Sequence, residues 1–526
     1  MAVNPLVIGL TMARRGLLAP APPLRQLAQL NALRIWRYGL AGEVRQAAGR
    51  SPHGIAVIDE DRGEFTYAAL VAEGDRVAAW LAAKGLGPGD KVGLLARNHV
   101  GAVAFMLGAS TRGVDLVLVN TGLAAEPLAA VVEREGIRAL VHDDEFEDAL
   151  AALGSALPMW SESTLLRELR ALGPVATPTP PEQGGRTIIL TSGTTGVPRG
   201  ATRTAPGGVG AMVSIIERIP LHAKDRVLVS APLFHTWGYA ALQITVGIRG
   251  TLVLQRRFDP AAAREALADH RCAAMFAVPV MLQRMMELPA DLEGRAARSR
   301  LRVVATSGSA YPSGFPTRFM DEYGDILYNL YGSTEASWIC IATPADLRRD
   351  PETAGTPPVG TRVEVLDDAL RPVADGEVGR IFVGNDLVFD GYTSGESKEF
   401  HEGMVSTGDL GHVRDGLFFV DGRDDDMIVS GGENVYPGEV EAALARHDAV
   451  REVAVVGVPD PAYGQRLVAF VALRDGEALT EDEVKDLVKA TVSRHTVPRE
   501  VHFVEELPRN ATGKVLAREL RARVAP

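Results

Sequence analysis

The chain has 526 residues, of which 46% are hydrophobic and 23% are charged, a composition typical of globular domains and unlike that of disordered chains. This length exceeds one ordinary core, so we expect a large domain and at least one smaller domain. The net charge of −12 argues against a nucleic-acid-binding surface, and two cysteines, Cys272 and Cys340, are too few for a disulfide framework.

The N-terminal segment does not have the order of charges that an export signal needs. Residues 1–13 are apolar and precede Arg14 and Arg15, whereas a signal peptide begins with its cations.

The following segment, residues 24–38, has leucines and Trp36 at roughly helical spacing among arginines. Such a helix can make a peripheral contact with a membrane, but packing on its own domain is the interpretation we favour. Because no apolar run reaches about 18 residues, we predict no transmembrane segment and a cytoplasmic protein.

Short apolar runs alternate with helical patterns along the next part of the chain. Residues 91–95 and 114–119 have the composition of buried strands and residues 100–111 that of a helix, an order that predicts a parallel sheet. The same pattern continues, with strands expected at 227–230, 251–254, 274–278 and 301–305 and a helix at 260–271. Beyond Thr361 the chain changes to short strands between glycine and aspartate turns, at 362–366, 379–383 and 417–420.

A glycine-rich loop follows the apolar run 188–190. Its glycines let the backbone turn and bring N–H groups against an anion, while its hydroxyl groups and a fixed guanidinium can bind phosphate oxygens. The loop lacks the Gly-Lys-Ser/Thr of the common nucleotide hydrolases. A flexible linker is the alternative, but linkers rarely follow a buried strand directly. We predict a phosphate-binding loop made by Thr191, Ser192, Gly193, Thr194, Thr195, Gly196 and Arg199.

Two acidic motifs follow later strands. Glu335 stands beside Thr334 after the run 326–330, and a carboxylate beside a small hydroxyl group suits Mg²⁺ held between protein and triphosphate. Asp409 lies in a glycine turn, where one carboxylate can accept hydrogen bonds from both hydroxyls of a ribose. Taken alone, each motif is as well explained by an ordinary turn with a solvated acid as by a ligand site.

A polar turn and a second glycine-rich loop predict a domain boundary. We place the large domain at residues 1–421, a hinge at 422–426 and a small domain at 427–526.

The small domain alternates short strands and helices. Strands are expected at 453–458 and 467–472, and a helix at 481–493 is capped by Thr480. Near the end of the chain, Lys514 stands on a loop before a further helical pattern. A lysine on a mobile lid can be brought to a reacting centre and withdrawn again.

Together these motifs resemble those of the adenylate-forming enzymes, which include acyl-CoA synthetases, adenylation domains and firefly-type luciferases. They stand in the family's order from about residue 50 to Leu520 and are most similar to those of fatty-acid–CoA ligases. The resemblance implies an α/β fold, with a large N-terminal α/β domain that carries a distorted β-barrel-like subdomain and a small mobile α+β C-terminal domain. It also implies ATP, Mg²⁺ and coenzyme A as cofactors.

The resemblance assigns roles around the nucleotide base and phosphates. Tyr331 would stack on adenine, with Gly332 and Ser309 beside it. Thr334 would contact the α-phosphate, and Glu335 would bind the metal ion.

The resemblance also assigns the parts that move. Asp409 would bind the ribose with Arg423 nearby, and Lys514 would neutralise charge between the carboxylate and the α-phosphate. The small domain would rotate about Asp425, which would bring Gly431 and Gly432 toward a channel for the pantetheine arm.

Residues 231–238 indicate the class of substrate. Amino-acid-activating relatives carry an aspartate for the ammonium group where this chain has His235, so a buried ammonium would lack a counter-charge here. We therefore predict a carboxylic acid without an α-amine. His235 is alternatively a core histidine, and a pocket role for Trp237 stays open. The predicted substrate-binding residues are His235, Trp237, Gly238, Ser307 and Gly308.

The sequence thus predicts an ATP-dependent carboxylic acid–CoA ligase with two half-reactions. A medium- or long-chain fatty acid is favoured as substrate, with aromatic and polycyclic acids open, and a monomer or homodimer is expected. A stand-alone acyl-AMP ligase that loads an acyl carrier protein is the nearer alternative. A non-catalytic sensor is disfavoured because Glu335 and Lys514 are present.

The chain departs from most relatives at one position of the phosphate loop. Arg199 replaces their lysine and retains its charge.

Overall fold

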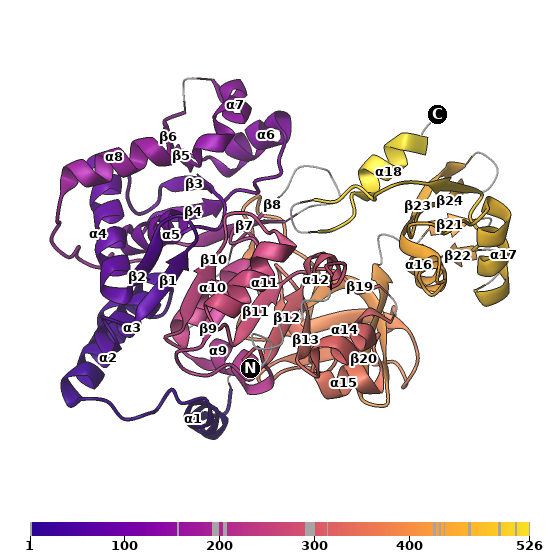
Figure 1. Cartoon of the computed structure of the whole chain (residues 1–526), viewed down its shortest axis with the longest axis horizontal. Helices are drawn as coiled ribbons and strands as arrows, with labels where there is room; N and C mark the ends of the chain where they lie inside the picture. Colours follow the sequence, from indigo (N-terminus) through magenta and orange to yellow (C-terminus); the bar gives the residue numbers. More distant parts are fainter. Residues whose placement is uncertain are drawn as a thin grey trace.

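The structure is a computed structural model, and it describes residues 3–154, 157–191, 199–202, 208–289, 300–312, 314–423, 428–430, 433–435, 437–460, 464–492, 496–510 and 513–524. These residues form four sheets, three in the part of the chain up to residue 423 and one after it. Figure 1 shows the later part as a smaller body at one end of the molecule. The large α/β domain and small α+β domain expected from the sequence are confirmed.

Two sheets of the large domain are built around parallel strands. The seven-stranded sheet has the order β17-β8-β7-β4-β3-β5-β6, and its strands from β7 to β6 are parallel. Its members are β3 (Lys91–Leu95), β4 (Asp115–Leu118), β5 (Ala139–His142), β6 (Met159–Ser161), β7 (Thr187–Thr191), β8 (Arg199–Thr202) and β17 (Gly391–Tyr392).

The second sheet has eight strands in the order β14-β13-β12-β11-β9-β10-β1-β2. All neighbours from β13 to β1 are parallel, and β14 and β2 close the two edges antiparallel. Its members are β1 (Ile55–Asp59), β2 (Gly63–Thr66), β9 (Arg226–Val229), β10 (Thr251–Leu254), β11 (Ala274–Ala277), β12 (Val303–Ser307), β13 (Leu327–Ser333) and β14 (Ser337–Ala342).

Helices cover both faces of these sheets, which is why their strands read as continuous apolar runs. One core takes side chains from both sheets and from α3 (Leu40–Arg50), α4 (Tyr67–Ala83), α5 (Val100–Arg112) and α10 (Thr236–Gly247), so these helices form a layer between the sheets. Along β10, Leu252 and Leu254 face this shared core and Val253 faces the core on the opposite side.

The outer layers are formed by shorter helices. The eight-stranded sheet is covered on its far face by α11 (Pro260–Asp269), α12 (Pro279–Met286) and α14 (Phe315–Tyr323), and the seven-stranded sheet by α6 (Ala125–Glu135) and α7 (Glu147–Leu150). The remaining helices of the large domain are α1 (Pro5–Arg14), α2 (Pro23–Trp36), α8 (Glu162–Leu172), α9 (Gly210–Arg218) and α15 (Pro344–Arg349).

A third sheet of the large domain is antiparallel and lies next to the small domain. It contains β15 (Arg362–Leu366), β16 (Gly379–Gly384), β18 (Phe400–His401), β19 (Met404–Arg414) and β20 (Leu417–Arg423). Its last strand ends at Arg423, and the first strand of the small domain begins at Ile428.

The small domain has its own sheet and its own core. The sheet contains β21 (Ile428–Ser430), β22 (Glu433–Val435), β23 (Val450–Asp460), β24 (Gly464–Leu473) and β25 (Glu500–Phe503), and its helices are α16 (Pro437–Ala445), α17 (Glu481–Thr491) and α18 (Ala517–Val524). Thr480 caps α17 as predicted, in a reciprocal capping box with Glu483.

The N-terminal helix α2 packs against α3 along one side only. Its outer side exposes Leu24, Leu27 and Leu30, at 79%, 62% and 64% of their surface. The favoured prediction, that this helix packs on its own domain, is therefore right for the side that contacts α3. It does not describe the outer side, where the three leucines are exposed. In the described part of the chain, no helix combines the length and apolar character needed to cross a membrane.

Candidate active site

The predicted motifs meet where strands of both parallel sheets end. β7 ends at Thr191, β12 ends at Ser307, and β13 ends at Ser333 immediately before Thr334 and Glu335. Ligand sites of α/β sheets lie outside the carboxyl ends of their strands, where side chains from several loops converge. The sheets therefore position the predicted residues at one edge of the large domain.

Glu335 is a buried acid at this edge, with 8% of its surface exposed. Tyr392 donates a hydrogen bond to its Oε1 at 2.6 Å, and the Phe389 N–H binds the Glu335 carbonyl oxygen at 2.7 Å. Burial alone would raise the pKa of Glu335, but the charge of Lys398 and the Tyr392 hydrogen bond outweigh it and lower that pKa. The carboxylate is therefore ionised at neutral pH, which is the form that binds a cation.

Thr334 joins this acid to the start of α10. The hydroxyls of Thr334 and Thr236 share a hydrogen bond of 2.9 Å, which connects the β13–β14 turn to the helix N-terminus. Both threonines also line a large cavity described below. The predicted phosphate contact thus lies at the border between the acidic motif and this cavity.

Asp409 and Tyr331 form a second pair close by. The Tyr331 hydroxyl donates to Asp409 Oδ2 at 2.5 Å, and Arg423, opposite Asp409 in the β19–β20 ladder, places Nη1 3.6 Å from Oδ1. Burial raises the pKa of Asp409, although the Tyr331 hydrogen bond and the charge of Arg423 act against it. Gly332, next to Tyr331, approaches the carbonyl oxygen of Ser337 so closely that a Cβ would lie 2.0 Å from it.

Lys514 comes from the small domain and lies among these groups. Burial and the charge of Arg423 lower the pKa of its ammonium, while Asp409 and Glu335 act in the opposite direction. Lys514 as a residue is exposed to solvent. The structure therefore brings this lysine into electrostatic range of both predicted carboxylates, across the domain boundary.

Backbone contacts fix the loop that carries Lys514. The Lys514 N–H donates to Asn510 Oδ1 at 2.9 Å, and the Asn510 N–H donates to the Lys514 carbonyl oxygen at 2.9 Å. Gly513 has φ +79°, and a Cβ on it would lie 2.6 Å from Val280 Cγ1 of α12 in the large domain. A glycine is needed here both for the left-handed backbone and for the close approach of the two domains.

His235 lies at the N-terminus of α10, facing the lysine. Burial, together with the charge of Lys514, lowers the pKa of His235 to about 4, so its imidazole is neutral at physiological pH. No carboxylate contributes to this shift. Among the described residues, no acid thus influences the His235 imidazole, and an acid without an α-amine stays the prediction from the missing aspartate.

Trp237 and Gly238 belong to the packing of the first turn of α10. The Trp237 ring is 4% exposed, lies 4.8 Å from the Phe276 ring and donates from Nε1 to the Ala277 carbonyl oxygen at 3.1 Å. A Cβ on Gly238 would lie 2.1 Å from the Pro232 carbonyl oxygen. The structure places Trp237 in the core and not among the side chains that line the large cavity.

The segment after β12 begins with a glycine in a conformation that other residues rarely adopt. Ser307 is buried at the end of the strand, paired with Leu330 of β13, and Gly308 has φ +107°. Ser309 is partly exposed.

Only the two ends of the predicted phosphate loop are described. Thr191 donates from Oγ1 to the Arg199 carbonyl oxygen at 3.3 Å, and Arg199 forms an ion pair with Glu396 at 2.6 Å and lies over the Tyr392 ring. The other residues predicted for this loop and for the moving parts lie outside the described residues; these are Ser192, Gly193, Thr194, Thr195, Gly196, Asp425, Gly431 and Gly432.

A cavity of about 800 Å³ extends from this site into the large domain. At one end it is lined by Thr236 and Thr334, and elsewhere by side chains of α2, α3, α10 and β7. Apolar groups predominate, as in sites that bind organic ligands. None of the sequence motifs predicts the rest of this lining, which includes Leu33, Trp36, Glu43, Thr187, Tyr239, Ala240, Gln243 and Ile244.

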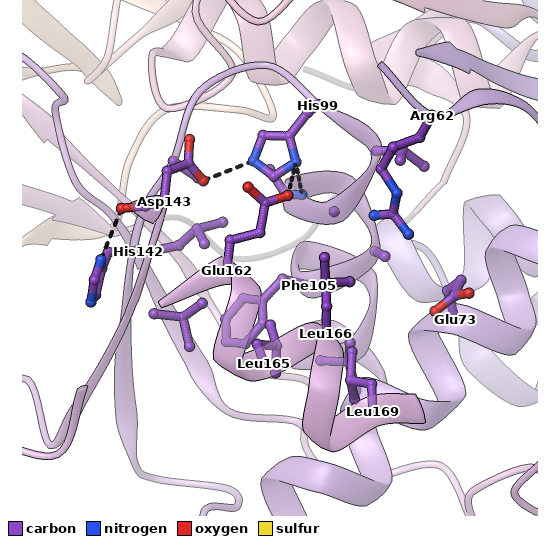
Figure 2. A pocket seen from close by; sticks show the side chains of 18 of the residues that line it. Arg62, Glu73, His99, Phe105, His142, Asp143, Glu162, Leu165, Leu166 and Leu169 are labelled. Carbon is purple, nitrogen blue, oxygen red and sulfur yellow. Dashed lines mark hydrogen bonds and ion pairs between the residues drawn. The ribbon is translucent and has the colours of Figure 1, made fainter. Parts of the chain in front are cut away.

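A second, small cavity of about 30 Å³ lies away from this edge, around His99 (Figure 2). His99 contacts Asp143 through Nε2 at 2.9 Å and Glu162 through Nδ1 at 3.3 Å. Arg256 places its guanidinium 3.2 Å from Asp143 and 2.7 Å from Glu162. Because the Arg256 guanidinium and the His99 imidazole both contact these two carboxylates, we interpret the cluster as a structural network that joins the start of α5, the end of β5 and α8.

Comparison with known proteins agrees with this geometry. Residues 44–393 match the family described as AMP-binding enzyme, and residues 439–514 match the AMP-binding enzyme C-terminal domain. The chain is 32% identical over 500 residues to a feruloyl-CoA synthase of Amycolatopsis, covering 92% of this chain and 99% of that protein. It is 32% identical over 489 residues to a 2-succinylbenzoate–CoA ligase of Geobacillus kaustophilus, covering 91% and 96%.

A solved structure shows the same arrangement. The o-succinylbenzoate CoA synthetase of Bacillus subtilis, in complex with its acyl-adenylate intermediate, superposes with a TM-score of 0.79 at 29% identity, covering 91% of this chain and 97% of that protein.

Proposed function

This chain belongs to the AMP-binding enzyme family and is an AMP-forming acid–thiol ligase, and we propose that it joins a hydrophobic carboxylic acid to coenzyme A. The observation that carries the proposal is that Lys514 lies within electrostatic range of Glu335 and Asp409, while Thr334, next to Glu335, lines a largely apolar cavity. Nucleotide-binding groups and space for an acyl group are thus adjacent.

In the first half-reaction, a carboxylate oxygen of the acid attacks the α-phosphorus of ATP. The bond between the α-phosphorus and the bridging oxygen breaks, pyrophosphate leaves, and an acyl-adenylate forms. Such transfers depend on positioning and charge neutralisation more than on covalent help from the protein. Lys514 would supply positive charge between the reacting carboxylate and phosphate, and Asp409 would hold the ribose.

Glu335 suits a magnesium ion at this site. It is buried and ionised, and Tyr392 orients it through Oε1. Mg²⁺ prefers one or two carboxylates together with substrate phosphates, and when bound it would neutralise charge on the triphosphate. Glu335 would hold the ion and Thr334 would orient the α-phosphate beside it.

In the second half-reaction, the thiol sulfur of coenzyme A attacks the acyl carbon, loses its proton, and AMP leaves. We propose that the small domain first rotates about Asp425 and withdraws Lys514. At Gly513 the Lys514 loop lies close to Val280 of the large domain, and the rotation would separate these two residues. An Asp425→Pro variant should keep adenylation and lose thioester formation, because proline restricts the torsion a hinge needs.

The substrate class is the finer part of the proposal. The neutral His235 argues against an acid with a free α-amine, since a buried ammonium would be unpaired. The relatives named above carry the names of feruloyl and succinylbenzoate acids, which does not support the sequence preference for fatty acids. We therefore propose a hydrophobic acid that fills the 800 Å³ cavity, aromatic or aliphatic.

Product analysis by mass spectrometry tests the whole proposal. The protein is incubated with MgATP and a panel of aromatic, fatty and polycyclic acids, with and without coenzyme A. Acyl-CoA and AMP are the expected products. Acyl-adenylate that accumulates despite coenzyme A would favour the alternative acceptor, an acyl carrier protein, and absence of any adenylate with every acid would refute the proposal.

A further inference from the structure

One acidic side chain in the large cavity has no part in the chemistry described so far. Glu43 stands in the first turn of α3, a helix whose neighbouring side chains, such as Leu40 and Val44, are buried. It lines the same cavity that Thr236 and Thr334 line at the catalytic end. Its Oε2 atom is out of contact with solvent and has no hydrogen-bond partner among the described residues.

Among the described residues, no cation contributes to the pKa of this carboxyl group. Arg45 on the same helix is paired with Asp75, Arg186 is paired with Asp115, and Arg249 donates to the Leu17 carbonyl oxygen. Burial is therefore the sole influence on Glu43, and it raises the pKa of this group to about 7. A buried acceptor without a donor costs free energy, so its presence in a cavity wall needs a reason.

Two polar neighbours of Glu43 on this wall are already paired, although Ser337 Oγ and Arg249 Nε, which also belong to the cavity lining, have no hydrogen-bond partner among the described residues. Tyr239 on α10, which is close enough to sense the charge of Glu43, shares a 3.0 Å hydrogen bond between its hydroxyl and that of Thr187. Gln46 accepts a hydrogen bond from Gln29 at 2.7 Å. Glu43 is thus the cavity-facing acceptor that these neighbours leave open.

We propose that Glu43 accepts a hydrogen bond from a hydroxyl group at the far end of the bound acid, so that the enzyme prefers hydrophobic acids with a distal hydroxyl. This inference rests on the proposed function, because it takes the acid's carboxylate to lie at Thr334 and the rest of the acid to extend toward α3. A neutral hydroxyl suits this wall better than an ammonium, which would carry a full charge into largely apolar surroundings. A phenol and an aliphatic alcohol offer the same donor.

Matched pairs of acids test the preference. ATP–pyrophosphate exchange is measured with 4-hydroxycinnamate against cinnamate, and with 16-hydroxyhexadecanoate against hexadecanoate, so that the phenol and the alcohol are separate arms. We expect kcat/KM to be roughly 10- to 100-fold higher for the hydroxylated acid in at least one pair, the range expected for a buried hydrogen bond to an acid. A pair of ω-amino acids against their parent acids forms a third arm.

The variant Glu43→Leu should abolish this preference. It should lower kcat/KM for the hydroxylated acid by roughly 10- to 100-fold and leave the parent acid unchanged or improved. Glu126→Leu is the matched control, since Glu126 is an exposed glutamate in the first turn of α6 and should not alter the ratio. If Glu43→Leu does not fold, Glu43→Met, which also lacks a strong hydrogen-bond acceptor, replaces it, with the ratio of the two acids as the readout.

The outcomes separate the two claims. If no acid supports exchange in the wild type, the proposed function fails. If acids support exchange but hydroxylated and parent acids are equal in both arms, or the ratio persists in the Glu43 variants, the inference alone is overturned. A preference for ω-amino acids over hydroxy acids would also overturn it, because the donor would then be an ammonium.

Discussion

The two ends of the catalytic cleft are built in different ways. The nucleotide end uses short motifs whose functional residues lie side by side in sequence, such as Thr334 and Glu335, at the ends of strands. The acyl end is a cavity wall assembled from helices far apart in the chain, so that Glu43 of α3 faces Tyr239 of α10. The difference suggests that the first end sets the reaction and the second sets the substrate, and variants can separate the two.

The largest effect should come from Lys514→Ala. Removal of the ammonium that neutralises charge at the α-phosphate should slow acyl-adenylate formation roughly a thousandfold for every acid in the panel. Thioester formation from supplied acyl-adenylate should be spared, because the lysine is withdrawn for that step. Single-turnover assays of the two half-reactions measure this, and equal loss in both would remove Lys514 from its assigned role.

The next effect should come from Glu335→Gln. The amide keeps the shape of the side chain but loses the charge that would hold Mg²⁺, so adenylation should fall roughly 300-fold and require more Mg²⁺. Tyr392→Phe is the control that keeps the carboxylate and removes only the 2.6 Å hydrogen bond, and its loss should be much smaller. Magnesium titrations of the exchange rate compare the three proteins; similar half-saturation values would contradict the metal role.

Much of the nucleotide end could be predicted from sequence because its information is local. β3 and β10 occupy the predicted residues, and the buried strands were recognisable from their apolar runs. β12 lies two residues later than expected, at Val303–Ser307, because Thr306 and Ser307 are polar yet buried by pairing with β13. Hydrophobicity alone cannot locate such a strand end.

The acyl end could not be predicted, because its contacts are long-range. Trp237 was left open as a pocket residue from its place in a motif, whereas the structure packs it on Phe276 and lines the cavity with Tyr239 and Ala240 from the same helix. The one local signal for Glu43 was an acid within the otherwise buried sequence of α3. An acid in α3 indicates a substrate contact only once α10 and β7 are known to lie across the cavity from it.

The raised pKa of Glu43 predicts how the free energy of unfolding depends on pH. Its pKa is near 7 when folded against an ordinary 4.5, so the folded protein holds a proton that the unfolded chain has lost between these values. Stability should therefore fall as pH rises from 4.5 to 7 and then level off, by about 3 kcal/mol in total. Glu43→Gln should lack this loss, which urea unfolding at pH 5 and pH 8 can measure. Parallel pH profiles for the two proteins would contradict the buried acid.

The smallest effect should come from Ala240→Phe, which tests most directly whether the acyl end can be changed without the nucleotide end. Ala240 lines the cavity from α10, so the larger ring should take up space meant for the acyl group without touching the nucleotide end. We expect kcat/KM for bulky acids to fall roughly tenfold, since strained packing in a filled pocket costs about 1–3 kcal/mol. A short acid such as propanoate, assayed in the same way, should react as it does with the wild type, and KM for ATP should stay the same. If kcat/KM for ATP fell as much as kcat/KM for the bulky acid, the two ends would not be separable. The substrate wall would then also shape the nucleotide site.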